Sequence, residues 1–358
     1  MKLPLKTVTS RIDQRRDCLP WDSRFISLRG IVTMRIVRDV AFAAILCMSF
    51  AGLCSAATAG ATPKAIFVIL DGIPADVIER VSTPTIDAIA SQGGYTRAVT
   101  GGPVGQPGET PTVSAPGYMS LVTGTWANKH NVYDNYDLSP NYDYWNLFRL
   151  VKHERPALRI GIFSTWIDNR TVLLGEGKSE AGGFLFDHVI DGLELDTARF
   201  PTQPMDRQIA LVDWAIADEG AAVIAQEAPD LSWFYLQYTD DIGHEYGDGP
   251  EFDQAVMDMD ARLEKIWAAV SARQQAYNED WLVVVTTDHG RDGETGREHE
   301  GHTERERTIW IACNSQRLSS RFKDIPEIVD IYPSIARHMG ITIPEAIASQ
   351  LDGRSFID

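Results

Sequence analysis

Five short apolar segments recur along the chain, and segments with helical periodicity separate them. A continuous apolar run of six to eight residues is typical of a strand that is buried on both faces, as in a parallel sheet. Alternating strands and helices predict an α/β fold, with a mostly parallel central sheet covered by helices on both faces. The predicted strands are 64–70, 159–165, 231–238, 281–287 and 308–313, and the predicted helices are 83–93, 204–226, 251–274 and 328–339.

The chain after residue 60 contains no stretch with the composition of a linker. We therefore expect residues 60–358 to form a single catalytic domain. Residues 170–200 are less regular than their surroundings, and we interpret them as an insertion over the functional site.

Residues 34–59 have the pattern of a secretory signal peptide. Arg35 and Arg38 precede an apolar stretch that ends in a small-residue cleavage site. The apolar stretch is too short for a membrane span, so we expect none in the mature chain. Residues 1–33 are polar and rich in arginine, which does not suit a position ahead of a signal peptide. We interpret them as an upstream extension from a mis-assigned start, and we expect a periplasmic or secreted protein.

Charge and cysteine content exclude several classes of function. Beyond residue 59 the chain has 24 basic and 46 acidic residues, a formal charge of −22. This charge argues against wrapping of nucleic acid and against binding to an anionic membrane. An anionic substrate would need a local positive centre, such as metal ions. Cys313 is the single cysteine of this part, which leaves no intramolecular disulfide there.

Acidic residues and histidines follow three of the predicted strands. Asp71 follows the first strand, Asp240 and His244 follow the third, and Asp288 and His289 follow the fourth. Ligands of open α/β sheets bind at the carboxyl ends of the strands. Carboxylate and imidazole groups suit Zn²⁺, with Mn²⁺ or Fe as alternatives. Taken singly, each of these positions is explained by a capped turn or by a charged residue in a solvent-exposed loop. Their occurrence after three separate strands favours a metal site.

The remaining histidines divide into two groups. His299 and His302 follow closely after the Asp-His pair, so either extends the candidate ligand set. We interpret the other four as surface residues: His130, His153, His188 and His338.

Ser114 lies between a Gly/Pro-rich approach and a run that suits a helix. Free backbone N–H groups and the helix dipole favour an anion at such a junction, so its hydroxyl is well sited to attack a phosphate. An ordinary N-cap serine explains the same local pattern. The neighbouring strand-end acids favour the nucleophile.

These motifs together resemble the alkaline phosphatase superfamily. Strand-Asp-Gly at Asp71, Ser-x-Pro-Gly at Ser114, Asp-x-x-Gly-His at Asp240, Asp-His-Gly at Asp288 and a late histidine occur in the order of that superfamily. The sequence is most similar to its branch of type I phosphodiesterases and nucleotide pyrophosphatases. The resemblance covers residues 64–358 and implies an alkaline-phosphatase-like three-layer α/β/α sandwich.

The resemblance also implies two zinc ions and their ligands. One ion would be held by Asp240, His244 and a late histidine. His299 fits the spacing to the next strand, and His302 remains the alternative. The other ion would be held by the ligands Asp71, Asp288, His289 and the Ser114 oxygen. The Ala115 N–H and the Asn135 side chain would bind non-bridging oxygens of the substrate.

The implied activity is hydrolysis of a phosphodiester or pyrophosphate through a phosphoseryl intermediate, in a small-molecule phosphate ester or nucleotide. Monoester-preferring relatives use a basic pair near Lys-Asp-Arg, and here Asp168 and Arg170 stand in the matching stretch. An acid beside a dianion costs affinity, which favours diesters over an alkaline phosphatase activity.

A sulfatase would need an arginine where Tyr118 stands. A catalytically inactive binding protein is a further alternative. It would not need a metal-binding residue at every ligand position, whereas this sequence has one at each. The oligomeric state stays open.

Overall fold

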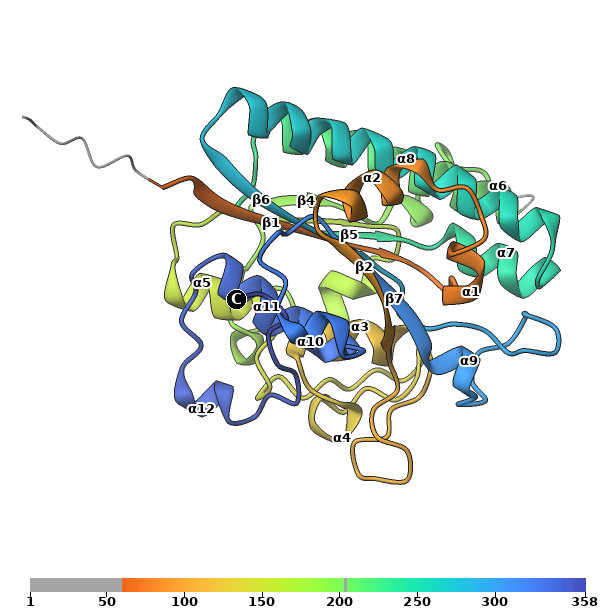
Figure 1. Cartoon of the computed structure of the whole chain (residues 1–358), viewed down its shortest axis with the longest axis horizontal. Coiled ribbons are helices and arrows are strands. Elements are labelled where there is room, and N and C mark those ends of the chain that lie inside the picture. The colour runs from red at the N-terminus through yellow and green to blue at the C-terminus, as the bar shows by residue number, and fades with distance from the viewer. Residues whose placement is uncertain (1–59, 203–204) are drawn as a thin grey trace, which may run out of the picture. The chain divides into compact units, whose positions relative to one another are not determined.

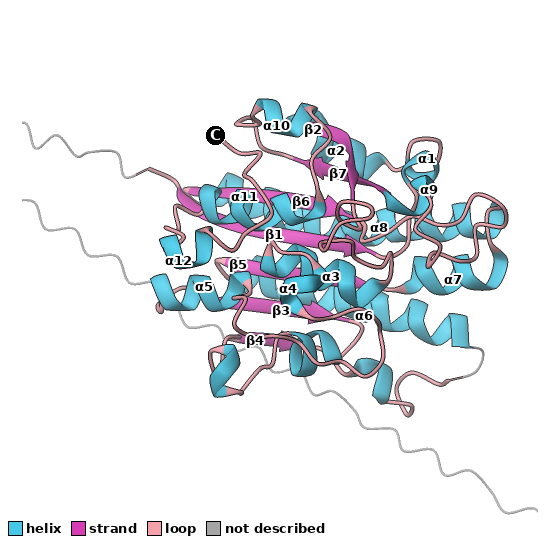
Figure 2. Ribbon diagram, turned by 90° about the horizontal axis from the view of Figure 1, so that it is seen from below, coloured by secondary structure: helices cyan, strands magenta, loops and turns pink. Residues whose placement is uncertain are grey.

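A seven-stranded sheet runs through the centre of the fold, in the order β2-β7-β6-β1-β5-β3-β4 (Figure 2). The computed structural model describes residues 60–202 and 205–358. Only β7 runs antiparallel to its neighbours, and the other adjacent strands are parallel. The strands are β1 (Thr62–Leu70), β2 (Gly94–Val99), β3 (Ile160–Ser164), β4 (His188–Ile190), β5 (Leu231–Leu236), β6 (Glu279–Thr286) and β7 (Thr308–Cys313).

Helices cover both faces of the sheet and give three layers (Figure 1). One face carries α3 (Ser114–Thr123), α5 (Leu147–Glu154) and α11 (Ile331–His338). The other carries α2 (Pro84–Gln92), α6 (Met205–Gln226), α7 (Tyr238–Tyr246) and α8 (Pro250–Ala276). The shorter helices are α1 (Ala75–Ile78), α4 (Ala127–His130), α9 (Glu304–Arg307), α10 (Ser320–Lys323) and α12 (Glu345–Ala348), with single turns at η1 (Asn169–Leu173), η2 (Ser179–Ala181), η3 (Leu193–Leu195) and η4 (Ile328–Asp330).

The central strand β1 explains why its segment is continuously apolar. Successive side chains of a strand point to opposite faces of the sheet. Phe67 and Ile69 therefore pack beneath α3, α5 and α11, whereas Ile66 and Val68 pack beneath α6 and α8. All four are fully buried, and each such burial stabilises the fold by about 1.5–3 kcal/mol.

The predicted fold class is confirmed, and each of the five predicted strands is present. Two further strands, β2 and β4, were not predicted, and each has a physical reason. β2 is an edge strand whose first four residues alternate between half-buried and exposed, so it forms no apolar run. β4 has only three residues. It pairs with β3, so part of the segment 170–200 forms the edge of the sheet.

One predicted boundary was wrong in a way that affects the site. The third predicted strand was extended to Tyr238, but β5 ends at Leu236 and Tyr238 begins α7. The Thr239 hydroxyl donates to the backbone oxygen of Asp71 at 2.6 Å, which ties the start of α7 to the end of β1. Asp240 therefore lies in the first turn of a helix.

The expected upstream extension and signal peptide, residues 1–59, lie outside the described residues. From residue 60 onward, the described residues belong to one compact unit. Within them, none of the helices combines the length and the apolar character that crossing a bilayer requires.

Candidate active site

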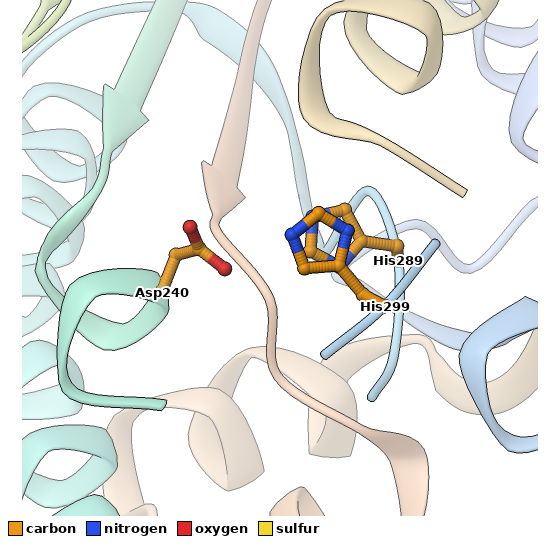
Figure 3. A group of neighbouring side chains, drawn as sticks. All are labelled: Asp240, His289 and His299. Atoms are coloured by element: carbon orange, nitrogen blue, oxygen red, sulfur yellow. The ribbon is translucent and has the colours of Figure 1, made fainter. Parts of the chain in front are cut away.

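The carboxyl ends of β1, β5 and β6 bring two groups of acids and histidines together. Asp71 follows β1 directly, and Asp288 and His289 follow β6. These three offer ligand atoms within 4.8 Å of one another. Asp240, His289 and His299 form a second group by the same measure, and Figure 3 shows the Asp240 carboxylate directed toward the two imidazoles. His289 belongs to both groups.

The first group has the features of a cation site. His289 Nε2 lies 3.4 Å from Asp71 Oδ1 and 3.4 Å from Asp288 Oδ2. Asp71 Oδ1 and Asp288 Oδ2 are buried and lack a conventional hydrogen-bond donor. An unsatisfied buried carboxylate oxygen is costly unless a cation binds it. These residues therefore fit a divalent metal ion.

The pKa values in this group reflect the same lack of positive charge. Burial, with repulsion from Asp288 and Asp240, raises the pKa of Asp71 well above its usual range. Burial and repulsion from Asp240 raise the pKa of Asp288 to about 7. Burial lowers the pKa of His289 well below its usual value, so its imidazole is neutral and able to bind a metal.

Two tyrosines fix the Asp71 carboxylate, and neither was predicted as a site residue. Tyr118 and Tyr235 each donate a hydrogen bond to Asp71 Oδ2, the second at 2.7 Å. Oδ1 remains directed at His289. Tyr118 lies four residues after Ser114 on the same helix, a spacing that places both on one face and could have revealed it. The hydroxyl of Tyr235 lies within an apolar strand and gave no such signal.

His244, the predicted ligand on α7, lies beside the second group and extends it. His244 Nε2 lies 3.4 Å from Asp240 Oδ2 and 3.1 Å from His299 Nε2. His299 Nδ1 donates to the backbone oxygen of Thr112 at 2.7 Å, which leaves Nε2 as the acceptor that faces His244 and Asp240. His302 lies outside both groups, and its Nδ1 pairs with Glu109 Oε1 at 3.3 Å. The structure thus brings His299, and not His302, to Asp240.

Arg291, two residues after His289, was not predicted to have any role. It is fully buried and donates from Nη2 to Asp240 Oδ1. Burial would raise the pKa of Asp240, but this guanidinium, with the hydrogen bond from His244, holds it below the usual range. The sequence gave little indication of this contact, because an arginine in a loop rich in acids and histidines is typical of the protein surface.

Ser114 is the first residue of α3, at the edge of the first group. Its Oγ lies 3.4 Å from His289 Nε2. Val113 is the N-cap residue and makes no side-chain cap, so the alternative of an ordinary capping serine is wrong. Gly117 lets α3 approach this closely, because a Cβ there would meet the Asp288 Cβ at 3.0 Å and the Asp288 backbone oxygen at 3.2 Å.

The predicted oxyanion donors lie beside Ser114 but are bonded to each other. The Ala115 N–H donates to Asn135 Oδ1 at 2.8 Å. This contact orients the Asn135 amide, so that Nδ2 is the group left to donate to a ligand. The Ala115 N–H can bind a substrate oxygen only if it leaves Asn135.

A cavity of about 410 Å³ opens beside Ser114. Its charged lining residues are all acidic: Asp71, Asp168 and Asp240. Arg170, predicted to bind substrate, is absent from the lining and pairs with Asp191 through two bonds of 2.6 and 3.0 Å. Residues 170–200 contribute no lining residue, so the expected insertion over the site does not form the wall of this cavity.

Two of the four histidines predicted to lie on the surface are buried. His130 and His338 have exposed fractions of 0% and 6%. His130 Nδ1 accepts from the Val132 N–H at 3.2 Å, and Nε2 lies 3.2 Å from Ser120 Oγ. Burial lowers the pKa of His130 to about 3, so this side chain is neutral and anchors the loop after α4 to α3.

Solved structures with similar folds belong to hydrolases of the alkaline phosphatase-like superfamily. A 2-O GAG sulfatase aligns with a TM-score of 0.58 and 15% identity, over 82% of this chain and 73% of that chain. The phosphonate monoester hydrolase of Silicibacter pomeroyi aligns with a TM-score of 0.53 and 16% identity, over 82% and 75%. At these identities the likeness establishes the fold.

Two curated relatives match in sequence. Human ectonucleotide pyrophosphatase/phosphodiesterase family member 7 is 25% identical over 239 residues, which cover 64% of this chain and 48% of the relative. An uncharacterized pyrophosphatase/phosphodiesterase of Schizosaccharomyces pombe is 22% identical over 283 residues, covering 74% and 52%. The chain thus spans about half the length of these relatives. The family described as type I phosphodiesterase / nucleotide pyrophosphatase matches residues 65–305, and this chain belongs to that family.

Proposed function

We propose that this protein is an exported, metal-dependent hydrolase of phosphodiester or pyrophosphate bonds that uses Ser114 as its nucleophile. One observation carries the proposal: Ser114 Oγ lies 3.4 Å from His289 Nε2, beside buried carboxylate oxygens that lack a donor. Membership of the phosphodiesterase family supports the reaction class. Export is supported by the signal-like sequence of residues 34–59.

The two ligand groups fit two metal ions, and their donors suit Zn²⁺, with Mn²⁺ or Fe as alternatives. Asp71, Asp288, His289 and Ser114 would hold one ion, and Asp240, His244 and His299 the other. Bound as a pair, such ions would act as Lewis acids toward the phosphoryl group and lower the pKa of the attacking hydroxyl.

The residues of the chain position the reactants. The Ser114 hydroxyl loses its proton to solvent and Oγ forms a bond to phosphorus, while the bond from phosphorus to the leaving oxygen breaks and releases an alcohol or a phosphate. The product of this step is a phosphoseryl ester, which water hydrolyses to free Ser114. Asn135 Nδ2 donates to a non-bridging oxygen, an interaction worth about 2.7–4 kcal/mol by analogy with oxyanion holes.

The charge of the cavity supports a diester or pyrophosphate over a monoester. Monoester-preferring relatives use a basic pair near a Lys-Asp-Arg motif, and Asp168 stands at the position that matches its lysine. Asp168 lines the cavity, and Arg170 pairs with Asp191. A monoester dianion carries more negative charge than a diester, so acidic walls disfavour it more. An alkaline phosphatase on the same scaffold is the alternative. Tyr118 stands where a sulfatase would need an arginine, and its hydroxyl contacts Asp71.

The test compares three substrates with zinc-loaded protein near pH 8. We expect bis-p-nitrophenyl phosphate to have a higher kcat/KM than p-nitrophenyl phosphate, and p-nitrophenyl sulfate to be hardly hydrolysed. Removal of the metal by a chelator should abolish hydrolysis of both phosphate esters, and added zinc should restore it. A monoester preference of about tenfold, some 1.4 kcal/mol, would favour the alkaline phosphatase alternative. Activity that survives exhaustive chelation would contradict a metal-dependent reaction.

A further inference from the structure

Arg291 supplies a buried positive charge to one ligand group and not to the other. Its side chain has no exposed surface. Nη2 donates to Asp240 Oδ1 and, at 2.7 Å, to the Asp240 backbone oxygen. Nε donates to the Gly72 oxygen at 3.1 Å, and Nη1 to the Arg297 oxygen at 2.8 Å. The guanidinium thus ties the ends of β1 and β5 to the loop after β6.

This contact leaves Asp240 with one oxygen for a metal. Oδ1 is engaged by Arg291, and Oδ2 lies 3.4 Å from His244 Nε2. The single negative charge of the Asp240 group is therefore offset by the charge of Arg291. A cation bound by Asp240, His244 and His299 would gain little net electrostatic attraction from its ligands.

The Asp71 group differs in both respects. It contains two carboxylates, and the hydrogen bonds to them come from neutral donors: the hydroxyls of Tyr118, Tyr235 and Thr287 and the Gly72 N–H. Asp71 Oδ1 and Asp288 Oδ2 are each left without a donor. A cation there would meet two uncompensated negative charges in a buried setting, where attraction is stronger than in water.

We propose that Arg291 makes the two metal sites unequal in affinity. The site of Asp71, Asp288 and His289 fills first and holds its ion tightly. The site of Asp240, His244 and His299 fills second and exchanges its ion more readily. The inference rests on the proposed two-metal function, and it predicts that a half-loaded protein predominates when metal is limiting.

A purely structural role for Arg291 is the alternative, because the same hydrogen bonds join three segments. Such a role would affect folding stability, and removing the guanidinium would then leave the affinity of the weaker binding step unchanged. The discriminating readout is therefore the affinity of each metal-binding step, which can be measured without turnover.

The first experiment titrates metal-free protein with Zn²⁺ in competition with a chromophoric chelator. We expect two steps whose dissociation constants differ by at least about tenfold. Asp240→Asn should remove the weaker step and retain the tighter one. Asp288→Asn should remove the tighter step.

The second experiment changes the guanidinium itself. Arg291→Met should tighten the weaker step by about tenfold, and Arg291→Lys, which keeps the charge, should stay near the wild type. Arg273→Met is a matched control. Arg273 is a largely buried arginine that pairs with Glu279 at the start of β6, outside both ligand groups, so both steps should be unchanged.

Circular dichroism and thermal unfolding of the metal-free variants establish that each is folded. If Arg291→Met does not fold, Arg291→Gln, which also removes the charge, takes its place. Two steps of equal affinity in the wild type, a weaker step that Asp288→Asn removes, or a weaker step that loss of the Arg291 charge leaves unchanged would overturn the inference alone. Binding of fewer than two ions per chain would contradict the proposed two-metal function, and the inference with it.

Discussion

Tyr235 donates a 2.7 Å hydrogen bond to Asp71 Oδ2, the same oxygen that accepts from Tyr118. The two bonds fix the carboxylate so that Oδ1 faces His289. We predict that Tyr118→Phe and Tyr235→Phe each weaken zinc binding by roughly 10–100-fold, as is usual for residues that orient a metal ligand. Competition titration measures this directly. Tyr332→Phe is a matched control, since its buried hydroxyl has no hydrogen-bond partner among the described residues, and its zinc affinity should be unchanged.

The contact between Gly117 and Asp288 predicts a steric effect on catalysis. A methyl group at position 117 would meet the Asp288 Cβ at 3.0 Å, so Gly117→Ala should displace the start of α3 from the metal ligands. Because small displacements of a reacting group are costly, we expect kcat to fall by about 100-fold with the protein still folded. Gly293→Ala, whose Cβ would meet only Arg305 Cδ at 4.0 Å, should keep wild-type turnover. Equal rates for both variants would contradict this packing argument.

His299 and His302 give a paired test of the late ligand. His299 Nε2 lies 3.1 Å from His244 Nε2, whereas His302 pairs with Glu109. His299→Ala should therefore cost one of the two bound zinc ions and more than about 100-fold in kcat/KM. His302→Ala should retain both ions, measured by elemental analysis. The reverse order of losses would assign the ligand to His302.

His130 predicts a dependence of stability on pH. Its folded pKa of about 3 lies below the ordinary value of 6.5, because burial disfavours the imidazolium. Above pH 6.5 both folded and unfolded states are neutral, and the contribution is complete. As pH falls from 6.5 toward 3, the unfolded state takes up a proton that the folded state does not, so stability is lost.

The His130→Asn variant isolates this effect. Its amide oxygen can still accept from the Val132 N–H, but it carries no titrating group. Urea unfolding of metal-free protein should show the variant less stable at pH 8, by about 1 kcal/mol for the lost contact with Ser120. By pH 4.5 we expect the wild type to lose about 2–3 kcal/mol relative to the variant. A difference that does not change with pH would exclude His130 as a titrating group in the unfolding reaction.

The sequence predicted those parts of the fold that depend on long apolar patterns. The central strands β1, β5 and β6 are buried on both faces, so their composition reveals them, and the acids after them mark the edge where ligands bind. β2 and β4 are edge strands with exposed residues, which local composition does not distinguish from loops.

Predictions that needed three-dimensional contacts were less successful. Arg170 was assigned to the substrate from its position along the chain, but Asp191 engages its guanidinium. Arg291 was overlooked, because its burial depends on Gly72, Asp240 and Arg297 meeting around it. His130 was taken as a surface residue, although α3 and its own loop enclose it. Such partners are remote in sequence, and periodicity carries no information about them.

The central claim is that Ser114 becomes covalently phosphorylated during turnover, and acid quenching tests it most directly. Zinc-loaded protein is mixed with bis-p-nitrophenyl phosphate, quenched within the first turnovers, digested and examined by mass spectrometry. We predict that the p-nitrophenyl phosphoryl group appears on the peptide containing Ser114, and that Ser114→Ala shows no adduct and less than about a hundredth of the wild-type rate. An adduct on another residue, or a Ser114→Ala variant that keeps its activity, would contradict the account.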